Sequence, residues 1–293
     1  MGKTRIEIAK PDIIAEFDSN QRNVFKRSDI NKILISRHGF WRLTQSTGIT
    51  KFLDFMLNKT KLKKVKFEFP NRNEIRYTWS DYSIYELALT LKPKSFFSHY
   101  SAVFLHHLTE QIPKIIYLNH EQPLKSKKGV KILQHQIDSN FKRPVRQSRY
   151  IAKYKNMKIC ILNGMNTGRL GVIEIEGDQG ENILATNLER TLIDIAVRPV
   201  YSGGIFEVLK AYRIAKERDV SINKLSAMLK KIGYIYPYHQ VVGFYLEAAG
   251  VYDDSQLNLL RKFELKHDFY LTHQMKDTEY SKRWRLHYPK GFL

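Results

Sequence analysis

The 293-residue sequence lacks the features that mark disulfide-bonded, secreted or membrane-spanning proteins. Cys160 is its only cysteine, which excludes an internal disulfide and a cysteine-rich metal site. No run of about eighteen apolar residues occurs, so we expect neither a membrane span nor a membrane partner. The opening residues, MGKTRIEIAK, lack the apolar core of a signal peptide. Together these absences lead us to expect a cytoplasmic protein.

Acidic residues are also scarce relative to basic ones. The chain has 49 lysines and arginines against 29 aspartates and glutamates, a net charge of +20. Such a surplus predicts a polyanionic partner. A generally basic proteome would also raise the net charge, but here the charge is clustered. Residues 59–66, KTKLKKVK, hold five lysines, and residues 114–158 hold twelve basic residues against only Glu121 and Asp138.

Residues 11–80 follow the order typical of a winged helix. Helical patterns at PDIIAEF, VFKRSDINKILISRHG and TGITKFLDFMLNK precede two alternating stretches, KVKFEF and EIRYTW, which PNRN joins. Alternation on both sides of a short turn predicts an antiparallel hairpin. We therefore predict an α+β fold, with a winged helix-turn-helix domain over residues 1–80 and a larger mixed α+β domain over residues 81–293.

In a winged helix, the third helix reads the major groove of double-stranded DNA. The apolar stripe of the third helical segment leaves Thr50, Lys51, Asn58 and Lys59 facing outward, so we assign them to the groove. Basic side chains around the hairpin are assigned to phosphates: Lys61, Lys63, Lys64, Lys66, Arg72 and Arg76. Winged helices also serve as protein-contact modules, and the lysine cluster favours nucleic acid over that alternative.

A second basic segment covers residues 125–155. Interleaved Phe141 and Tyr150 suggest stacking on unpaired bases. A module that binds RNA or an acidic toxin is one reading, and a solvated charged face is an equally good one. The basic residues of this second patch are Lys125, Lys127, Lys128, Lys131, Lys142, Arg143, Arg146 and Arg149.

Catalytic and metal-binding patterns are weak. Glu174, Glu176 and Asp178 lie near one predicted strand, but no lysine follows them as in many magnesium-dependent nucleases. Three histidines, His99, His106 and His107, have no carboxylate at a ligand spacing. We therefore expect no enzyme activity, no metal and no cofactor. A metal-dependent nuclease that also uses Glu189 or Asp194 remains the alternative.

The segment LATNLERTLIDIAVRP, residues 184–199, predicts an apolar helix that carries charge. Thr186 suits the N-cap, with Glu189 completing a capping box. Arg190, Asp194 and Arg198 recur every four residues and so share one face. Because an unpaired buried charge is costly, we expect these residues to pair as a structural polar column.

Three stretches resemble the AbiEi family of type IV toxin–antitoxin antitoxins: LATNLERTLIDIAVRPVYSGGIFEVLKAY, YPYHQVVGFYLEAAG and FFSHYSAVFLHHLTEQIPKIIYLN. The resemblance extends from about Val24 to the end of the chain, with a longer segment between His38 and Thr47 than the family pattern. It implies a transcriptional regulator of an abortive infection system. Its winged helix would bind inverted repeats in its own promoter. Its C-terminal domain would counter a nucleotidyltransferase-like toxin without forming a tight complex.

Overall fold

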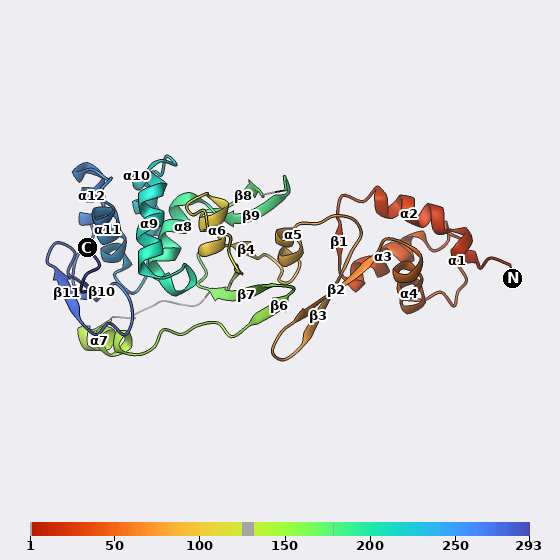
Figure 1. Ribbon diagram of the computed structural model, residues 1–293, viewed down its shortest axis with the longest axis horizontal. Coiled ribbons are helices and arrows are strands. Elements are labelled where there is room, and N and C mark those ends of the chain that lie inside the picture. The colour runs from red at the N-terminus through yellow and green to blue at the C-terminus, as the bar shows by residue number, and fades with distance from the viewer. Residues whose placement is uncertain (1, 125–131, 178) are drawn as a thin grey trace. The chain divides into compact units, whose positions relative to one another are not determined.

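The computed structural model describes residues 2–124, 132–177 and 179–293 and confirms the predicted α+β class (Figure 1). The chain forms two compact units. The first contains Met1–Pro93 with Ala152–Asn156, and the second contains Lys94–Ile151 with Met157–Leu293. The first unit extends beyond residue 80 because its hairpin binds the segment that follows. Arg76, for example, donates hydrogen bonds to Thr90.

The first unit has the helix and hairpin order of a winged helix. Its strands lie in the order β1-β3-β2-β6, and β2 pairs antiparallel with β3 from Lys63 opposite Thr78 to Glu68 opposite Asn73. The elements are α1 (Arg5–Ile8), α2 (Lys10–Asp18), β1 (Val24–Phe25), α3 (Arg27–Arg37), α4 (Ile49–Lys59), β2 (Lys63–Glu68), β3 (Asn73–Thr78), α5 (Ile84–Leu89) and β6 (Ile151–Tyr154).

The core of the first unit fixes the orientation of α4. Phe52, Leu53 and Met56 are buried at the spacing of one helical face. Trp41 stacks on Phe52 with ring centroids 5.7 Å apart, which anchors the long connection between α3 and α4. Phe55 packs against the same core and is only partly exposed.

The second unit contains the remaining helices and strands. They are β4 (Phe96–Phe97), α6 (Tyr100–Leu105), β5 (Ile115–Glu121), α7 (Gln134–Lys142), β7 (Met157–Gly164), β8 (Val172–Glu176), β9 (Asn182–Thr186), α8 (Leu188–Val197), the 3-10 helix η1 (Pro199–Tyr201), α9 (Ile205–Lys216), α10 (Ile222–Ile232), α11 (Tyr238–Ala249), α12 (Asp254–Arg261), β10 (Phe269–Tyr270), β11 (Thr278–Ser281) and β12 (Leu286–Pro289).

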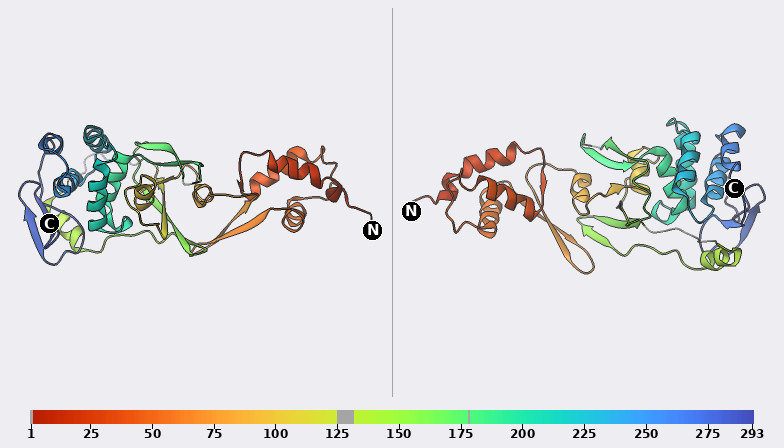
Figure 2. Two further views of the ribbon diagram at one scale, coloured as in Figure 1. Left: turned by 45° about the horizontal axis from the view of Figure 1, so that its top comes forward. Right: turned by 180° about the vertical axis from the view of Figure 1, so that it is seen from behind.

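Strands of the second unit form two groups. The larger has the order β7-β5-β4-β9-β8, in which β5 and β7 are parallel and β4 and β9 are parallel. The smaller has the order β10-β12-β11. Helices α8, α9, α10 and α11 pack on one another, and α8 is buried from Glu189 to Ala196. In both views of Figure 2, the cyan and blue helices of the second unit lie side by side.

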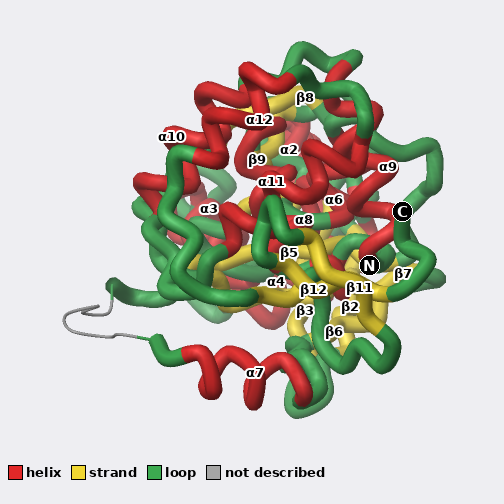
Figure 3. Tube along the Cα trace, turned by 90° about the vertical axis from the view of Figure 1, so that its left-hand side faces the viewer, coloured by secondary structure: helices red, strands yellow, loops and turns green. Residues whose placement is uncertain are grey.

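Two further contacts complete the core of the second unit. Gly243 of α11 faces Trp284 so closely that a Cβ atom would collide with the indole ring. Phe141 of α7 packs edge-on against Phe269 and stacks on Tyr270, which fastens α7 to the smaller sheet. Figure 3 shows α7 apart from the other labelled helices of the second unit. Among the described helices, none combines the length and apolar character that a bilayer span requires.

Candidate nucleic-acid interface

Helix α4 presents the polar face that the sequence predicted. Thr50, Lys51, Asn58 and Lys59 are all exposed, because the opposite face of the helix is committed to the core. The amide Nδ2 of Asn58 donates to the Asp54 carbonyl within the same helix at 2.8 Å. The face therefore offers one threonine hydroxyl and two lysines beside an amide that is already partly engaged.

Arg27, which sequence reasoning missed, belongs to this face. It is exposed at the first residue of α3, and its Nη2 donates to the Thr50 hydroxyl at 2.8 Å. This bond joins the N-terminus of α3 to the N-terminus of α4. The signal available in the sequence was a basic residue near the start of the helical segment that became α3. N-termini of helices carry free N–H groups that favour phosphate.

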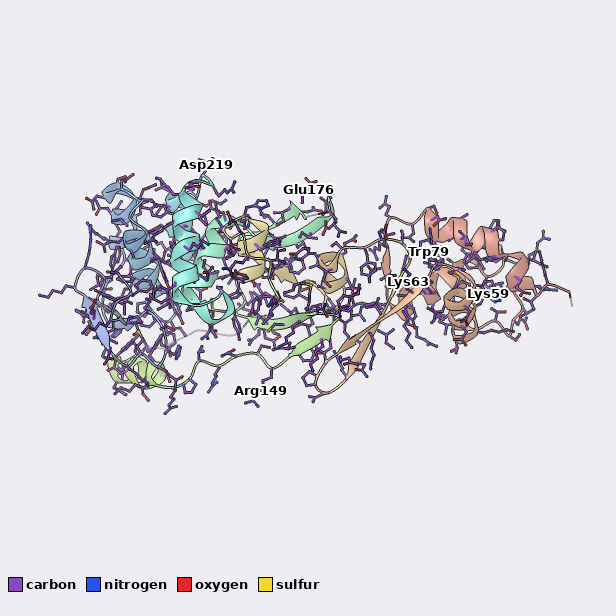
Figure 4. All side chains as sticks on the ribbon, viewed as in Figure 1. Lys59, Lys63, Trp79, Arg149, Glu176 and Asp219 are labelled. Carbon is purple, nitrogen blue, oxygen red and sulfur yellow. The ribbon has the colours of Figure 1, made fainter. Side chains whose placement is uncertain are left out.

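Hairpin strand β2 alternates as predicted, with Val65 and Phe67 buried and Lys64 and Lys66 exposed. Figure 4 shows Lys59 and Lys63 flanking the short turn from α4 to β2. The α4–β2 lysines, a set that we use below, are the exposed Lys51, Lys59, Lys63 and Lys64.

The predicted phosphate contacts differ in how far protein carboxylates already neutralise them. Lys66 Nζ pairs with Glu68 at 2.8 Å, and Arg72 Nη2 pairs with Glu74 at 2.8 Å. Lys61 pairs with Asp18 and lies over the Trp79 ring. The hydrogen bond from Lys61 holds the pKa of the Asp18 carboxyl below its usual value. Within the described ranges, none of the α4–β2 lysines has a carboxylate at ion-pairing distance, so their charge is the most available.

The assignment of Arg76 to phosphate was wrong. The residue is only 4% exposed. Its Nε and Nη2 donate to the hydroxyl and carbonyl of Thr90 at 2.9 Å each, and its Nη1 donates to Glu74 at 3.1 Å. On β3 the buried run is Arg76, Tyr77 and Thr78, while Ile75 is exposed, because the segment ending α5 supplies polar partners to Arg76. Arg76 is a structural cation.

The second basic patch is only partly described. Lys125, Lys127, Lys128 and Lys131 lie outside the described residues. The other four are exposed at the end of α7 and along the irregular segment that follows it: Lys142, Arg143, Arg146 and Arg149. Figure 4 labels Arg149 on this segment.

The predicted stacking role of Phe141 in this patch was wrong. The ring is 7% exposed and stacks with two rings of the same unit, those of Tyr270 and His273. The faces of the Phe141 ring are therefore covered by other side chains of the protein.

Ser148 anchors the segment that follows α7, since its hydroxyl donates to the Ile161 carbonyl at 2.7 Å and its N–H donates to the Tyr201 hydroxyl at 2.8 Å.

Helix α8 is capped differently from the prediction. Asn187, not Thr186, is the N-cap, and its side-chain oxygen accepts from the Arg190 N–H at 2.9 Å. Glu189 therefore makes no capping box. It accepts from the Ser221 N–H and pairs with Lys224 at 3.0 Å, which fixes α8 to the start of α10.

Two of the three charged residues predicted to form the polar column of α8, Arg190 and Asp194, form an ion pair. Arg190 Nε donates to Asp194 Oδ1 at 2.8 Å, with the two side chains 4% and 7% exposed. Arg190 Nη1 also donates to Thr167 and to the Leu170 carbonyl. Arg198 does not continue the column, because it is the C-cap with φ −137° and has left the helix. In the described part of the chain, no ion pair joins Arg198 to Asp194.

The carboxylates of the nuclease alternative are dispersed. Glu174 and Glu176 are exposed on β8, Asp178 lies outside the described residues, and Glu189 and Asp194 are engaged as above. The residues that the structure describes contain no group of three histidine, cysteine or carboxylate side chains able to hold a metal ion.

Of the three histidines, His99 is buried, His106 is half-buried and His107 is exposed. Burial lowers the pKa of His99 from 6.5 to about 4, and its Nδ1 lies 2.8 Å from the Ser98 hydroxyl. His106 Nε2 lies 2.6 Å from the Thr186 carbonyl. Both rings therefore occupy structural hydrogen bonds.

Comparison with known proteins gives a likeness of fold. No protein-family model matches the chain, and no curated protein matches it. A solved structure, the crystal structure of RV2827C protein from Mycobacterium tuberculosis, is similar to it with a TM-score of 0.61. The match covers 96% of this chain and 91% of that chain at 11% sequence identity. At this identity the similarity shows a shared fold and nothing more.

Proposed function

We propose that this protein binds duplex DNA through its first unit, with α4 in the major groove and the β2–β3 hairpin along the phosphates. The observation that supports this most directly is the set of α4–β2 lysines, which are exposed and lack carboxylate partners in the described chain. They adjoin Thr50 and Asn58, the side chains able to reach base edges. Lysines of this kind set affinity and salt dependence, whereas the groove side chains select sequence.

The biological role that we propose is a transcriptional autorepressor and antitoxin of a type IV, abortive infection system. Its support is the resemblance of the three sequence stretches to the AbiEi family. In this proposal the first unit binds inverted repeats in the promoter. The second unit counters a nucleotidyltransferase-like toxin without a tight complex. The chain would carry out no catalysis itself.

The test of DNA binding is a gel shift with the purified full chain. The probe is duplex DNA from directly upstream of its coding sequence, with a shuffled duplex of equal composition as competitor. We expect a discrete shift that the shuffled duplex competes poorly. Lys51→Gln should weaken it, whereas Lys210→Gln, which removes an exposed lysine of the second unit, should leave it unchanged. Equal loss in both variants, or no shift at all, would reject the proposal.

A parallel lane with magnesium tests the absence of catalysis. Intact DNA after incubation agrees with a pure binding protein. Cleavage that depends on magnesium and disappears in Glu176→Gln would favour the nuclease alternative instead.

A further inference from the structure

The second unit contains a cavity of about 500 Å³. Its walls come from four stretches that are distant in the sequence, within residues 146–148, 162–165, 190–201 and 234–238, together with His99 and Asn119. This volume lies within the range of roughly 300–1,000 Å³ that is typical of small-molecule sites. All of its lining residues belong to the second unit, whereas the α4–β2 lysines belong to the first.

One residue of the cavity wall, Asp194, has a buried carboxylate oxygen without a hydrogen-bond partner in the described part of the chain. Asp194 is 5% exposed and lines the cavity. Its Oδ1 accepts from Arg190, but its Oδ2 is buried with no hydrogen-bond partner among the residues that the structure describes. Leaving such an acceptor unsatisfied costs free energy that a bound N–H donor would recover. A ligand with an amino or imino group therefore suits this position.

Two further arginines make the cavity cationic. Arg146, on the segment after α7, and Arg198, at the end of α8, both line it. Asp194 is the one carboxylate among the described lining residues, and Arg190 already pairs with it. Arg146, which is exposed, and Arg198, which is half-buried, thus have no carboxylate partner among the described residues. A guanidinium matches the geometry of phosphate oxygens through paired hydrogen bonds.

Tyrosine rings supply the apolar part of the wall. Tyr201, Tyr234, Tyr236 and Tyr238 line the cavity, and Tyr234 meets Tyr238 edge to face at 5.2 Å. Burial raises the pKa of Tyr234, which keeps its hydroxyl neutral. Rigid aromatic walls favour a flat, unsaturated ligand ring over an aliphatic chain.

We propose that this cavity binds a nucleotide. Its phosphate would lie between Arg146 and Arg198, its base against the tyrosine rings, and an N–H of the base would donate to Asp194 Oδ2. A phosphate, an aromatic ring and an N–H donor occur together in a nucleotide, whether it is free or at the end of a strand. The proposal does not rest on the DNA-binding function.

Isothermal titration calorimetry on the full chain tests this proposal without added metal. The probes are the four common nucleoside monophosphates, with adenosine and ribose 5-phosphate as the two halves of one of them. We expect at least one monophosphate to bind with Kd below about 1 mM. Each half should bind about tenfold more weakly or worse, since it loses either the charged contact or the ring. A 5′-phosphorylated trinucleotide distinguishes the sources, because tighter binding than the monophosphate indicates the end of a strand.

Paired variants locate the binding. Arg198→Gln should weaken it about tenfold or more, whereas Arg218→Gln, at an exposed position after α9, should not change it. Arg146→Gln repeats the test on an exposed side chain if Arg198→Gln unfolds, as a thermal melt would reveal. No binding by any monophosphate, or equal binding by the wild type and both cavity variants, would overturn the proposal. We expect both cavity variants to shift the upstream duplex as the wild type does. The nucleotide proposal and the DNA-binding proposal can therefore fail independently.

Discussion

Replacing Asp194 with alanine isolates the contribution of the buried ion pair in α8. The substitution removes the carboxylate that Arg190 Nε contacts at 2.8 Å, with both side chains below one-tenth exposed. The Arg190 guanidinium then stays buried with only neutral acceptors, the Thr167 hydroxyl and the Leu170 carbonyl. Removing one partner of a buried pair costs about 3–5 kcal/mol of unfolding free energy. We expect a value near the lower end, about 3 kcal/mol, because these two acceptors remain.

Calorimetric melting of the full chain measures this loss. For a domain of roughly 150–250 residues, 3 kcal/mol lowers the melting temperature by about 6–12 °C. Glu264→Ala is the matched control, since it breaks the exposed pair with Lys266 and should change stability by less than about 1 kcal/mol. An unchanged melting temperature for Asp194→Ala would show that the buried pair does not stabilise the second unit.

A double variant separates loss of the pair from loss of packing. Arg190→Met with Asp194→Leu removes both charges and fills much of the same volume. Replacing a buried pair with apolar side chains is often neutral or stabilising, so the double variant should recover most of the lost stability. If it melts below Asp194→Ala, the hydrogen bonds of Arg190 to Thr167 and Leu170 matter more than the charge balance.

Three other expectations follow from the same contacts. Arg76→Ala should destabilise the first unit by about 2–4 kcal/mol in urea denaturation, because Glu74 and Thr90 lose their donor, whereas Lys66→Ala should be nearly neutral. The folded-state pKa of His99 is about 4 against 6.5 ordinarily. The folded state therefore binds fewer protons, and stability present above pH 6.5 is lost as the pH falls toward 4. His99→Gln should flatten this fall, by up to about 3 kcal/mol, in denaturation curves recorded across that pH range. Gly243→Ala should lower the melting temperature, because its Cβ would collide with Trp284.

Much of the fold follows from periodicity. The stripe of Phe52 and Met56 and the alternation of Val65 and Phe67 both arise from local geometry, and both predicted the buried face correctly. Arg76 followed the same alternation but was misplaced, because its partner Thr90 comes from a different element. Burial of a charged residue depends on tertiary partners, which a local pattern does not contain.

The candidate sites show the same division. Exposure of Lys51 and Lys64 could be predicted because the core faces of their elements were recognisable. The buried contact between Arg190 and Asp194 could be predicted from their spacing and the apolar helix around them. The cavity could not, since residues 146 and 234 approach α8 only through the tertiary fold. Arg198 shows what spacing alone cannot predict. Helical spacing placed it on the face of Arg190 and Asp194, but the helix ends at this residue.

The salt dependence of duplex binding decides whether the α4–β2 lysines contact DNA phosphates. Affinity for the upstream duplex is measured by fluorescence anisotropy across a series of salt concentrations, for the wild type, Lys64→Gln and Lys210→Gln. Four unpaired lysines on phosphates predict a log–log slope of about −4, which Lys64→Gln should reduce by about one and Lys210→Gln should leave unchanged. A wild-type slope near zero, or an equal slope in Lys64→Gln, would contradict the assignment of DNA binding to the α4–β2 lysines.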